Sequence, residues 1–373
     1  MTKKNPNGQN EHQDTCSQGK DTSRSPCCPG TPDRATPSCT CNGYTPPTVE
    51  IGDVTGTITF INRLDHFLTR WGVNRSGHRI EPGLYRLGNP TPDSPVVVTA
   101  NYTLSFDAVR SALQGTDCYI LVLDTKGINV WCAAGKGTFG TDELVHRISA
   151  TGLESIVRHQ TLVLPQLGAP GIAAHEVLRR SGFRVEYGPV RARDLPRYLA
   201  TRTATPEMRR VIFPLRDRLV LTPIELVHAA LPTLAAAILL YFLAGPLAAL
   251  GAITAVLTGT VLFPALLHFI PTKDFSTKGL ILGVIAAFPF ALSFAGDPPS
   301  PSGVNIMAAI AALLLMPAVT AYLALNFTGS TPFTSRSGVK TEIFRYVPLM
   351  AVMAGSGSAL ALLLAILRLT GVI

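Results

Sequence analysis

Hydrophobic positions follow two different patterns along the chain. Up to about residue 220, short apolar runs alternate with polar segments, whereas beyond it the apolar residues run almost unbroken. Five of the later runs are near the roughly 20 residues that a helix needs to cross the hydrocarbon core of a membrane. They cover residues 226–245, 246–270, 278–296, 303–327 and 346–367. The pattern predicts a soluble part followed by an all-α transmembrane domain of five helices.

The soluble part alternates strand-like and helix-like segments. Buried strands are predicted at "PVVVTA" (95–100) and "CYILVLD" (118–124), and two further strands at "TLVLPQL" (161–167) and "FRVEYGPV" (183–190). Helices are predicted at 105–115, 141–152 and 170–182, with Thr141 as an N-cap, Pro170 first in its helix, and Gly115, Gly152 and Gly182 at the helix ends. Strands that alternate with helices indicate an α/β domain with a doubly wound, mostly parallel, Rossmann-like sheet.

Composition divides the chain further. Residues 1–45 are polar and nearly devoid of large apolar side chains, so we expect a disordered tail. The tail holds five of the seven cysteines, Cys16, Cys27, Cys28, Cys39 and Cys41, at spacings unlike those of zinc or ferredoxin sites. It is either an incidental cysteine-rich segment or a flexible arm that catches a soft metal ion. The remaining boundaries are a soluble domain at 46–205, a linker at 206–225 and the transmembrane domain at 226–373.

Basic residues predict the orientation of the transmembrane domain. Lys and Arg cluster before the first run (Arg209, Arg210, Arg216, Arg218), between the second and third (Lys273, Lys278) and between the fourth and fifth (Arg336, Lys340, Arg345). The opposite loops hold only Asp297, and Arg368 is the one exception. We therefore expect a multi-pass protein of the cell inner (cytoplasmic) membrane with its soluble domain in the cytoplasm. Part of the net charge of +8 then comes from the basic residues that set the membrane orientation, so we expect no nucleic-acid partner.

The centres of the apolar runs carry no ionisable residue. Transporters and pumps usually place such residues there, so an anchor or scaffold is favoured over a polar pathway. Small residues 355–358 of the fifth run are expected to let that helix pack closely on a neighbour.

One stretch carries candidate chemistry. "GINVWCAAGKGTFG" (127–140) places Cys132 just after a predicted strand. The stretch lacks the spacing of a phosphate loop, and no second cysteine follows as in a thioredoxin-like motif. His146, His159 and His175 are potential bases for a cysteine nucleophile, but no sequence feature brings them to the thiol. Those three conventional explanations therefore fail or lack support.

Two interpretations of Cys132 remain: it lies on a helix that faces a ligand, or it is buried and unreactive. Asn129 is a good N-cap, so Cys132 would lie in the first helical turn, where the helix dipole and Lys126 or Lys136 favour a thiolate. In doubly wound sheets ligands bind beyond the carboxyl ends of the strands, and Thr99 and Ala192 lie at or just past two other such ends. The alternative is a buried, unreactive cysteine beside Trp131.

A family resemblance bears on this choice. "NVWCAAGK" (129–136) resembles the cap-helix motif of the mercury-methylating corrinoid proteins (HgcA family), and the likeness extends through "SPVVVTANYTLSFD", "LVLPQLGAPGIAAHEV" and "LNFTGSTPFTSRSGV". That family is related to the corrinoid iron-sulfur proteins of the acetyl-CoA pathway. The resemblance implies that Cys132 is the catalytic residue and the lower axial ligand of cobalt. It makes the cofactor-binding set Thr99, Asn129, Val130, Trp131, Cys132, Ala133, Ala134, Gly135, Lys136 and Ala192, with Trp131 anchoring the helix and the small residues leaving room for the macrocycle.

The resemblance also implies an activity. The cofactor would be a cobalamin-type corrinoid held base-off, and thiolate donation to cobalt would ease methyl transfer to Hg(II), forming methylmercury. Implied partners are a ferredoxin-like protein with two [4Fe-4S] clusters, a methyltetrahydrofolate-dependent methyl donor and the membrane. The cysteine-rich tail is not a feature of the family. Two other functions stay open: a membrane-tethered methyl carrier for one-carbon metabolism, and a non-enzymatic ligand sensor.

A second polar segment, "NFTGSTPFTS" (326–335), admits two interpretations. Its hydroxyls and Pro332 are typical of a turn that caps the fourth helix. The other interpretation is a docking surface for the soluble domain or a partner, formed by Thr328, Ser330 and Thr331.

Overall fold

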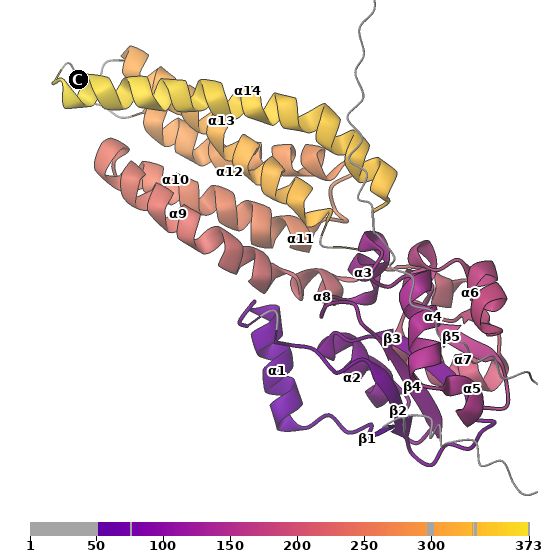
Figure 1. The fold of residues 1–373 in the computed structure, drawn as a ribbon. Coiled ribbons are helices and arrows are strands. Elements are labelled where there is room, and N and C mark those ends of the chain that lie inside the picture. Colours follow the sequence, from indigo (N-terminus) through magenta and orange to yellow (C-terminus); the bar gives the residue numbers. More distant parts are fainter. Residues whose placement is uncertain (1–50, 75–76, 297–301, 330, 332–333, 372–373) are drawn as a thin grey trace, which may run out of the picture. The chain divides into compact units, whose positions relative to one another are not determined.

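The computed structural model describes residues 51–74, 77–296, 302–329, 331 and 334–371. The cysteine-rich tail and Asp297 therefore lie outside the described residues. Within them, a six-stranded sheet with flanking helices precedes a series of long apolar helices (Figure 1). The predicted fold class, an α/β domain followed by five helices able to span a membrane, is confirmed.

The sheet is mixed and has the strand order β1-β2-β4-β3-β5-β6. Its strands are β1 (Gly52–Val54), β2 (Gly83–Leu87), β3 (Val96–Ala100), β4 (Cys118–Leu123), β5 (Thr161–Leu164) and β6 (Arg184–Tyr187). Strand β2 runs antiparallel to β4, and every other neighbouring pair is parallel. The four predicted strands, β3 to β6, form a contiguous parallel part of the sheet that ends at the edge strand β6. The prediction missed β1 and β2, which are short and partly exposed and so lack a continuous apolar run.

Helices cover both faces of this sheet. They are α1 (Phe60–Arg70), α2 (Thr103–Ala112), α3 (Val130–Lys136), α4 (Thr141–Ala150), α5 (Leu153–Ile156), α6 (Ala174–Ser181) and α7 (Leu195–Thr201), with 3₁₀ turns η1 (Gln166–Gly171), η2 (Ala192–Asp194) and η3 (Glu207–Arg209). Side chains of α3 to α6 pack on one face with Val98 and Leu121. Those of α2 and α7 pack on the other face with Val97 and Ile120. The sheet is thus doubly wound.

Two predicted helix starts are wrong. Gly140 occupies the N-cap position of α4, and Thr141 instead uses its Oγ1 to accept a hydrogen bond from the Ala173 backbone N at 2.9 Å. Helix α6 begins at Ala174, because Pro170 belongs to the 3₁₀ turn η1. Its predicted end is confirmed: Gly182 closes it at φ 74°, a conformation that favours glycine.

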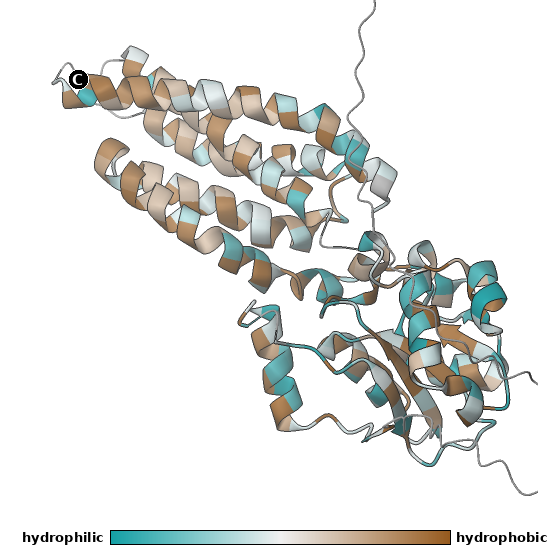
Figure 2. Cartoon of the chain, in the orientation of Figure 1, coloured by the Kyte–Doolittle hydropathy of each residue, from teal (hydrophilic) through white to brown (hydrophobic). Residues whose placement is uncertain are grey.

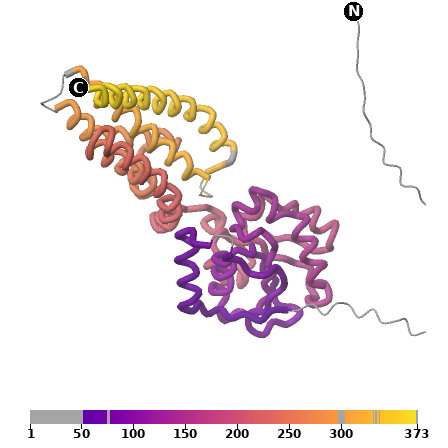
Figure 3. Tube along the Cα trace, turned by 60° about the vertical axis from the view of Figure 1, so that its left-hand side comes forward, coloured from indigo at the N-terminus to yellow at the C-terminus, as the bar shows by residue number. Residues whose placement is uncertain are grey.

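Among the residues that the structure describes, five candidate membrane spans follow, at Leu215–Ala244, Pro246–Leu266, Phe275–Ala295, Gly303–Phe327 and Ser337–Leu369. They are built from α8 (Leu215–Leu219), α9 (Thr222–Ala244), α10 (Pro246–Leu257), a π-helical turn η4 (Thr258–Leu262), α11 (Phe263–Leu266), α12 (Phe275–Ala295), α13 (Ser302–Phe327) and α14 (Arg336–Leu369). Figure 2 shows that most residues of these helices are hydrophobic, and Figure 3 shows the long helices running side by side. These features indicate a membrane protein.

Small residues let these helices approach one another. A Cβ added at Gly357 of α14 would lie 2.7 Å from Leu315 Cγ of α13, so the close packing expected around residues 355–358 is confirmed at this glycine. In the segment 326–335, Thr328 and Thr331 are buried, so their hydroxyls are not exposed to a separate partner, and docking of the soluble domain stays a prediction. The Thr328 Oγ1 donates to Leu325 O at 2.6 Å, as a helix-end turn requires. Ser330 and Pro332 lie outside the described residues.

Two of the cations that predicted the orientation are buried. The Lys278 Nζ donates to the carbonyl oxygens of Leu267 and Ile270. The Arg218 Nη1 donates to those of Pro264 and Ala265. Each cation therefore satisfies backbone carbonyls that follow or end α11. Both residues thus stabilise the helix connection, in addition to any effect on membrane orientation.

Candidate functional site

Helix α3 carries the candidate cysteine and is defined at both ends. The Asn129 Oδ1 accepts a hydrogen bond from the Cys132 backbone N at 2.9 Å, so the predicted N-cap is confirmed. Gly137 ends the helix at φ 84°. Because α3 follows β4 in the chain, it lies beyond the carboxyl end of that strand, the edge at which doubly wound sheets bind ligands.

The two faces of α3 differ in exposure. Val130, Ala133 and Ala134 are buried in the core beneath the helix. The exposed residues are Asn129, Gly135 and Lys136, and Cys132 and Trp131 are partly buried. Cys132 therefore lies among the residues that a ligand can reach, because positions 129, 132, 135 and 136 share one helical face.

This division corrects part of the expected cap helix. Val130, Ala133 and Ala134 anchor the helix in the core, in place of Trp131. Since the two alanine side chains point into the core, room for a macrocycle would come from Gly135 on the exposed face. The two alanines therefore allow the helix to pack closely on the core, and they do not make room for a cofactor on its exposed face.

A close contact beneath α3 requires glycine. A Cβ added at Gly171, the last residue of η1, would overlap the Phe139 carbonyl oxygen and lie 3.0 Å from Ala134 Cα. Phe139 is itself fully buried in the same core. The turn η1 and helix α3 therefore pack backbone against backbone, which fixes the height of α3 above the sheet.

A buried polar network ties the loop before α3 to strand β3. The Asn101 Oδ1 accepts hydrogen bonds from Thr125 N, Thr125 Oγ1 and Gly127 N at 3.0, 2.8 and 3.0 Å, and the Asn101 Nδ2 donates to Asp124 Oδ1 at 3.1 Å. Lys126 and Gly127 both have positive φ, at 59° and 72°, which turns the chain sharply toward α3. Sequence reasoning missed Asn101, and its only signal is a polar residue directly after a buried strand.

Two predicted cofactor residues lie elsewhere. Val96, Val98 and Ala100 of β3 face the core beneath α3, so by strand alternation Thr99 faces the other side of the sheet, where it is 1% exposed. Ala192, in η2, also packs on that other side. The structure therefore does not bring Thr99 or Ala192 to the exposed face of α3.

The remaining candidates from the sequence do not join Cys132 either. The His159 Nε2 lies 2.8 Å from Ser94 O, at the amino end of the parallel strands and thus at the opposite edge of the sheet. The His175 side chain is 82% exposed on α6, and His146 is exposed on α4. In the part of the chain that the structure describes, no group of three His, Cys, Asp or Glu side chains could hold a metal ion.

The second cysteine of the domain is chemically different. Cys118 begins β4 and is fully buried, and this burial, with the nearby Asp117 carboxylate, raises the pKa of its thiol to about 12. It therefore stays protonated at neutral pH. Of the two described cysteines, both free of disulfides, only Cys132 is accessible.

Comparison with known proteins concerns this α/β part of the chain. Residues 71–198 match the model of the CdhD family, the CO dehydrogenase/acetyl-CoA synthase delta subunit. Similar curated proteins are the acetyl-CoA decarbonylase/synthase complex subunits gamma of Methanopyrus kandleri (35% identical over 127 residues, 34% of this chain and 27% of that subunit), Methanothermobacter thermautotrophicus (34% over 127 residues, 34% and 27%) and Methanosarcina acetivorans (32% over 127 residues, 32% and 26%).

The match has clear limits. The chain spans about a quarter of the length of these curated relatives, 27% for the M. kandleri subunit. The family match begins at Trp71 and ends at Tyr198, so it contains the sheet from β2 to β6 and helix α3, and leaves out all five candidate spans. The segment that carries Cys132 is thus similar to a part of subunits from acetyl-CoA-forming and acetyl-CoA-cleaving complexes.

Proposed function

We propose that this chain is a membrane-tethered, corrinoid-dependent methyltransferase in which the Cys132 thiolate is the lower axial ligand of cobalt and Hg(II) is the methyl acceptor. The similarity of residues 71–198 to acetyl-CoA complex subunits supports a corrinoid-dependent methyl carrier. The finer assignment, mercury methylation, rests on the resemblance of "NVWCAAGK" to the cap helix of the mercury-methylating family. The observation that carries the proposal is the position of Cys132 on the exposed face of α3.

The residues around Cys132 fit a large flat cofactor. Asn129, Gly135 and Lys136 share the exposed face with the thiol, and Gly135 has no side chain to obstruct it. Asn129 caps the helix through the Cys132 backbone N, and the sulfur of the partly exposed Cys132 is a ligand type that suits a soft metal. Val130, Ala133 and Ala134 would support the helix from below, and Thr99 and Ala192, whose side chains pack on the other face of the sheet, would contact the cofactor only beyond the face of α3.

The chain's own groups would act by donation and positioning. A bound corrinoid supplies the cobalt that carries the methyl group. Cys132 would hold that cobalt through a thiolate, a strong electron donor, and the bound corrinoid would supply methyl transfer to a soft electrophile. The Asn101 network and Gly171 would hold α3, and with it the Cys132 side chain, at a fixed height above the sheet.

Substitution of Cys132 tests the proposal in the full-length protein. Loaded with cobalamin, the wild type should show a spectrum unlike that of the water-ligated base-off form. Cys132→Ala should abolish this spectrum and Hg(II) methylation, yet destabilise the fold by at most about 1 to 2 kcal/mol. Cys132→His should be nearly inactive because a neutral donor lacks the charge of the thiolate. Cys118→Ala is the matched control and should keep both signals. Wild-type methylation by Cys132→Ala would exclude the axial-ligand role.

The names of the relatives favour one alternative acceptor. They are subunits of acetyl-CoA decarbonylase/synthase complexes, so the same domain could serve as a methyl carrier for one-carbon metabolism. Transfer of a labelled methyl group to an acetyl-CoA-forming enzyme, without transfer to Hg(II), would support that function in place of mercury methylation.

Partners and orientation complete the proposal. A ferredoxin-like protein with two [4Fe-4S] clusters would reduce cobalt, a methyltetrahydrofolate-dependent enzyme would supply the methyl group, and the α/β domain would face the cytoplasm. Exposed Arg209, Arg210, Lys273, Lys340 and Arg345 support this orientation. A reporter fused after Ile373 should then lie outside the cytoplasm, and a cytoplasmic reporter would contradict the orientation.

A further inference from the structure

Helix α1 exposes an apolar stripe that the domain does not use. Phe60, Leu64, Phe67 and Trp71 follow one another at spacings of four, three and four residues, so they share one face of the helix. Their exposed fractions are 79%, 47%, 55% and 39%, and the adjacent Ile61 is 76% exposed. A soluble domain rarely leaves such a row of large side chains in water, so this face has a partner.

The opposite face of α1 is fastened to the domain by polar contacts. The His66 Nε2 lies 2.7 Å from Asp107 Oδ2 of α2, and the His78 Nδ1 lies 2.6 Å from Asp65 Oδ1. Asp107 is 2% exposed and also accepts from Arg110 Nε at 2.6 Å. These partly buried contacts orient α1 so that the apolar stripe points away from α2.

Cations accompany the stripe. Arg63 and Arg70 lie on α1, and Arg216 lies on α8. Among the residues that the structure describes, no acidic side chain forms an ion pair with any of these three guanidinium groups. Exposed aromatic and aliphatic side chains flanked by unpaired arginines match the chemistry of an anionic lipid surface.

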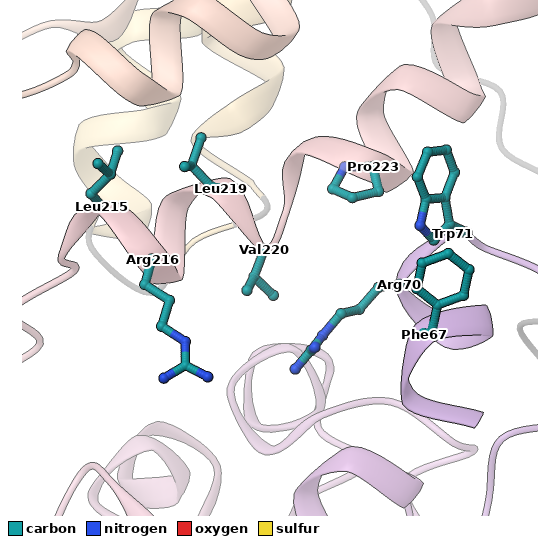
Figure 4. A pocket seen from close by; sticks show the side chains of 8 residues that line it. All are labelled: Phe67, Arg70, Trp71, Leu215, Arg216, Leu219, Val220 and Pro223. Carbon is teal, nitrogen blue, oxygen red and sulfur yellow. The ribbon is translucent and has the colours of Figure 1, made fainter. Parts of the chain in front are cut away.

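The stripe continues into a groove beside the first candidate span. A cavity of about 540 Å³ is lined by Phe67, Arg70, Trp71, Leu215, Arg216, Leu219, Val220 and Pro223. In Figure 4 the guanidinium groups of Arg70 and Arg216 lie below Leu215, Leu219 and Pro223. The residues of α8 and α9 in this groove belong to the span Leu215–Ala244, so the groove adjoins a segment suited to lipid.

We propose that α1 is an interfacial helix: its apolar stripe inserts at the boundary between headgroups and acyl chains, and Arg63, Arg70 and Arg216 bind the phosphate groups of anionic phospholipids. Trp71 at the end of the stripe suits this depth, because tryptophan favours the membrane interface. The occupant is membrane lipid and not a protein. The helix is then a second attachment of the α/β domain to the membrane, beside the covalent link through α8.

The two tryptophans of the chain make a matched test. In full-length protein reconstituted in nanodiscs, Trp131→Phe leaves Trp71 as the sole reporter, and Trp71→Phe leaves Trp131. Lipids with brominated acyl chains should reduce Trp71 fluorescence by about twofold or more and leave Trp131 nearly unchanged, because only an inserted side chain meets the bromines. Equal, weak quenching of both tryptophans would overturn the proposal. So would a Trp71 shielded from aqueous acrylamide yet unquenched by lipid, since a protein would then cover the stripe.

Headgroup charge tests the role of the arginines. Brominated phosphatidylglycerol should quench Trp71 more than brominated phosphatidylcholine does. The double variant Arg70→Gln with Arg216→Gln should lose this preference, whereas Arg184→Gln, an exposed arginine of β6, should retain it. If both lipids quench equally in the wild type, the binding of anionic headgroups is refuted.

Discussion

The buried side chain of Asn101 receives both the backbone N and the Oγ1 of Thr125, at 3.0 and 2.8 Å. These bonds join the carboxyl ends of β3 and β4, which are neighbours in the sheet. A third bond, from Gly127 N at 3.0 Å, fixes the turn that leads into α3. The position of Cys132 therefore depends on a residue about thirty positions before it in the chain.

Loss of this acceptor should weaken the domain. Asn101→Ala leaves buried donors of Thr125 and Gly127 unsatisfied, and we expect a loss of about 2 to 4 kcal/mol in unfolding free energy. Denaturant unfolding followed by Trp131 fluorescence, in a Trp71→Phe background, measures it. Asn89→Ala alters an exposed asparagine and should shift the transition little. A stable Asn101→Ala protein would mean that the loop finds other partners.

A methyl group at residue 171 should displace α3. Gly171→Ala forces a Cβ onto the Phe139 carbonyl, and such overpacking should destabilise the domain by about 1 to 3 kcal/mol. Because α3 shifts with it, affinity for cobalamin should fall as well, measured by titration of the absorbance. Gly83→Ala is the control, since a Cβ there meets no atom within 4 Å. Equal cobalamin affinities of the two variants would mean that the position of α3 does not depend on its packing against η1.

The two described cysteines should differ in reactivity. Burial holds the pKa of Cys118 at about 12, whereas Cys132 lies partly exposed, so iodoacetamide at neutral pH should modify Cys132 at least about tenfold faster. Peptide mass spectrometry resolves the two sites. In denaturant both should react, and rapid modification of Cys118 in the native protein would contradict its burial.

The same burial predicts a pH dependence of stability. The ordinary pKa of the thiol is 9.0 and that of folded Cys118 is about 12, so between these values the unfolded chain releases a proton that the folded chain retains. The unfolding free energy should therefore be unaffected below pH 9 and fall above it, by up to about 1.4 kcal/mol per pH unit. Burial also raises the pKa of Tyr85, Tyr187 and Tyr198, so the diagnostic quantity is the shallower alkaline slope of Cys118→Ala relative to wild type.

Lys278 should stabilise the helical part of the chain. Lys278→Met leaves the carbonyl oxygens of Leu267 and Ile270 without their donor, and we expect a loss of about 1 to 3 kcal/mol. Thermal unfolding in detergent measures this loss. Lys273→Met removes an exposed lysine of the same connection and should have little effect. Equal melting temperatures of the two variants would mean that Lys278 acts only on membrane orientation and does not stabilise the helices.

The sequence alone determined the elements that depend on local signals. The buried strands β3, β4 and β5 are mostly continuous apolar runs, the cap at Asn129 and the left-handed end at Gly182 depend on residue type, and the five spans depend on length and hydrophobicity. Each of these properties resides in a window of a few to some twenty residues. Periodicity and capping rules therefore suffice to predict them.

Only the tertiary structure decided which residues meet. Strand β2 enters the sheet antiparallel because it pairs with β4, which lies about thirty residues later in the chain. The faces of α3 were decided by the core beneath it, which buries Val130, Ala133 and Ala134 and leaves Cys132 accessible. Thr99 faces away from α3 because successive side chains of a strand alternate between the two faces of the sheet. The sequence shows this alternation but does not show which face α3 covers. Contacts between distant segments select among locally equivalent arrangements, so they, and not local propensity, position the thiol.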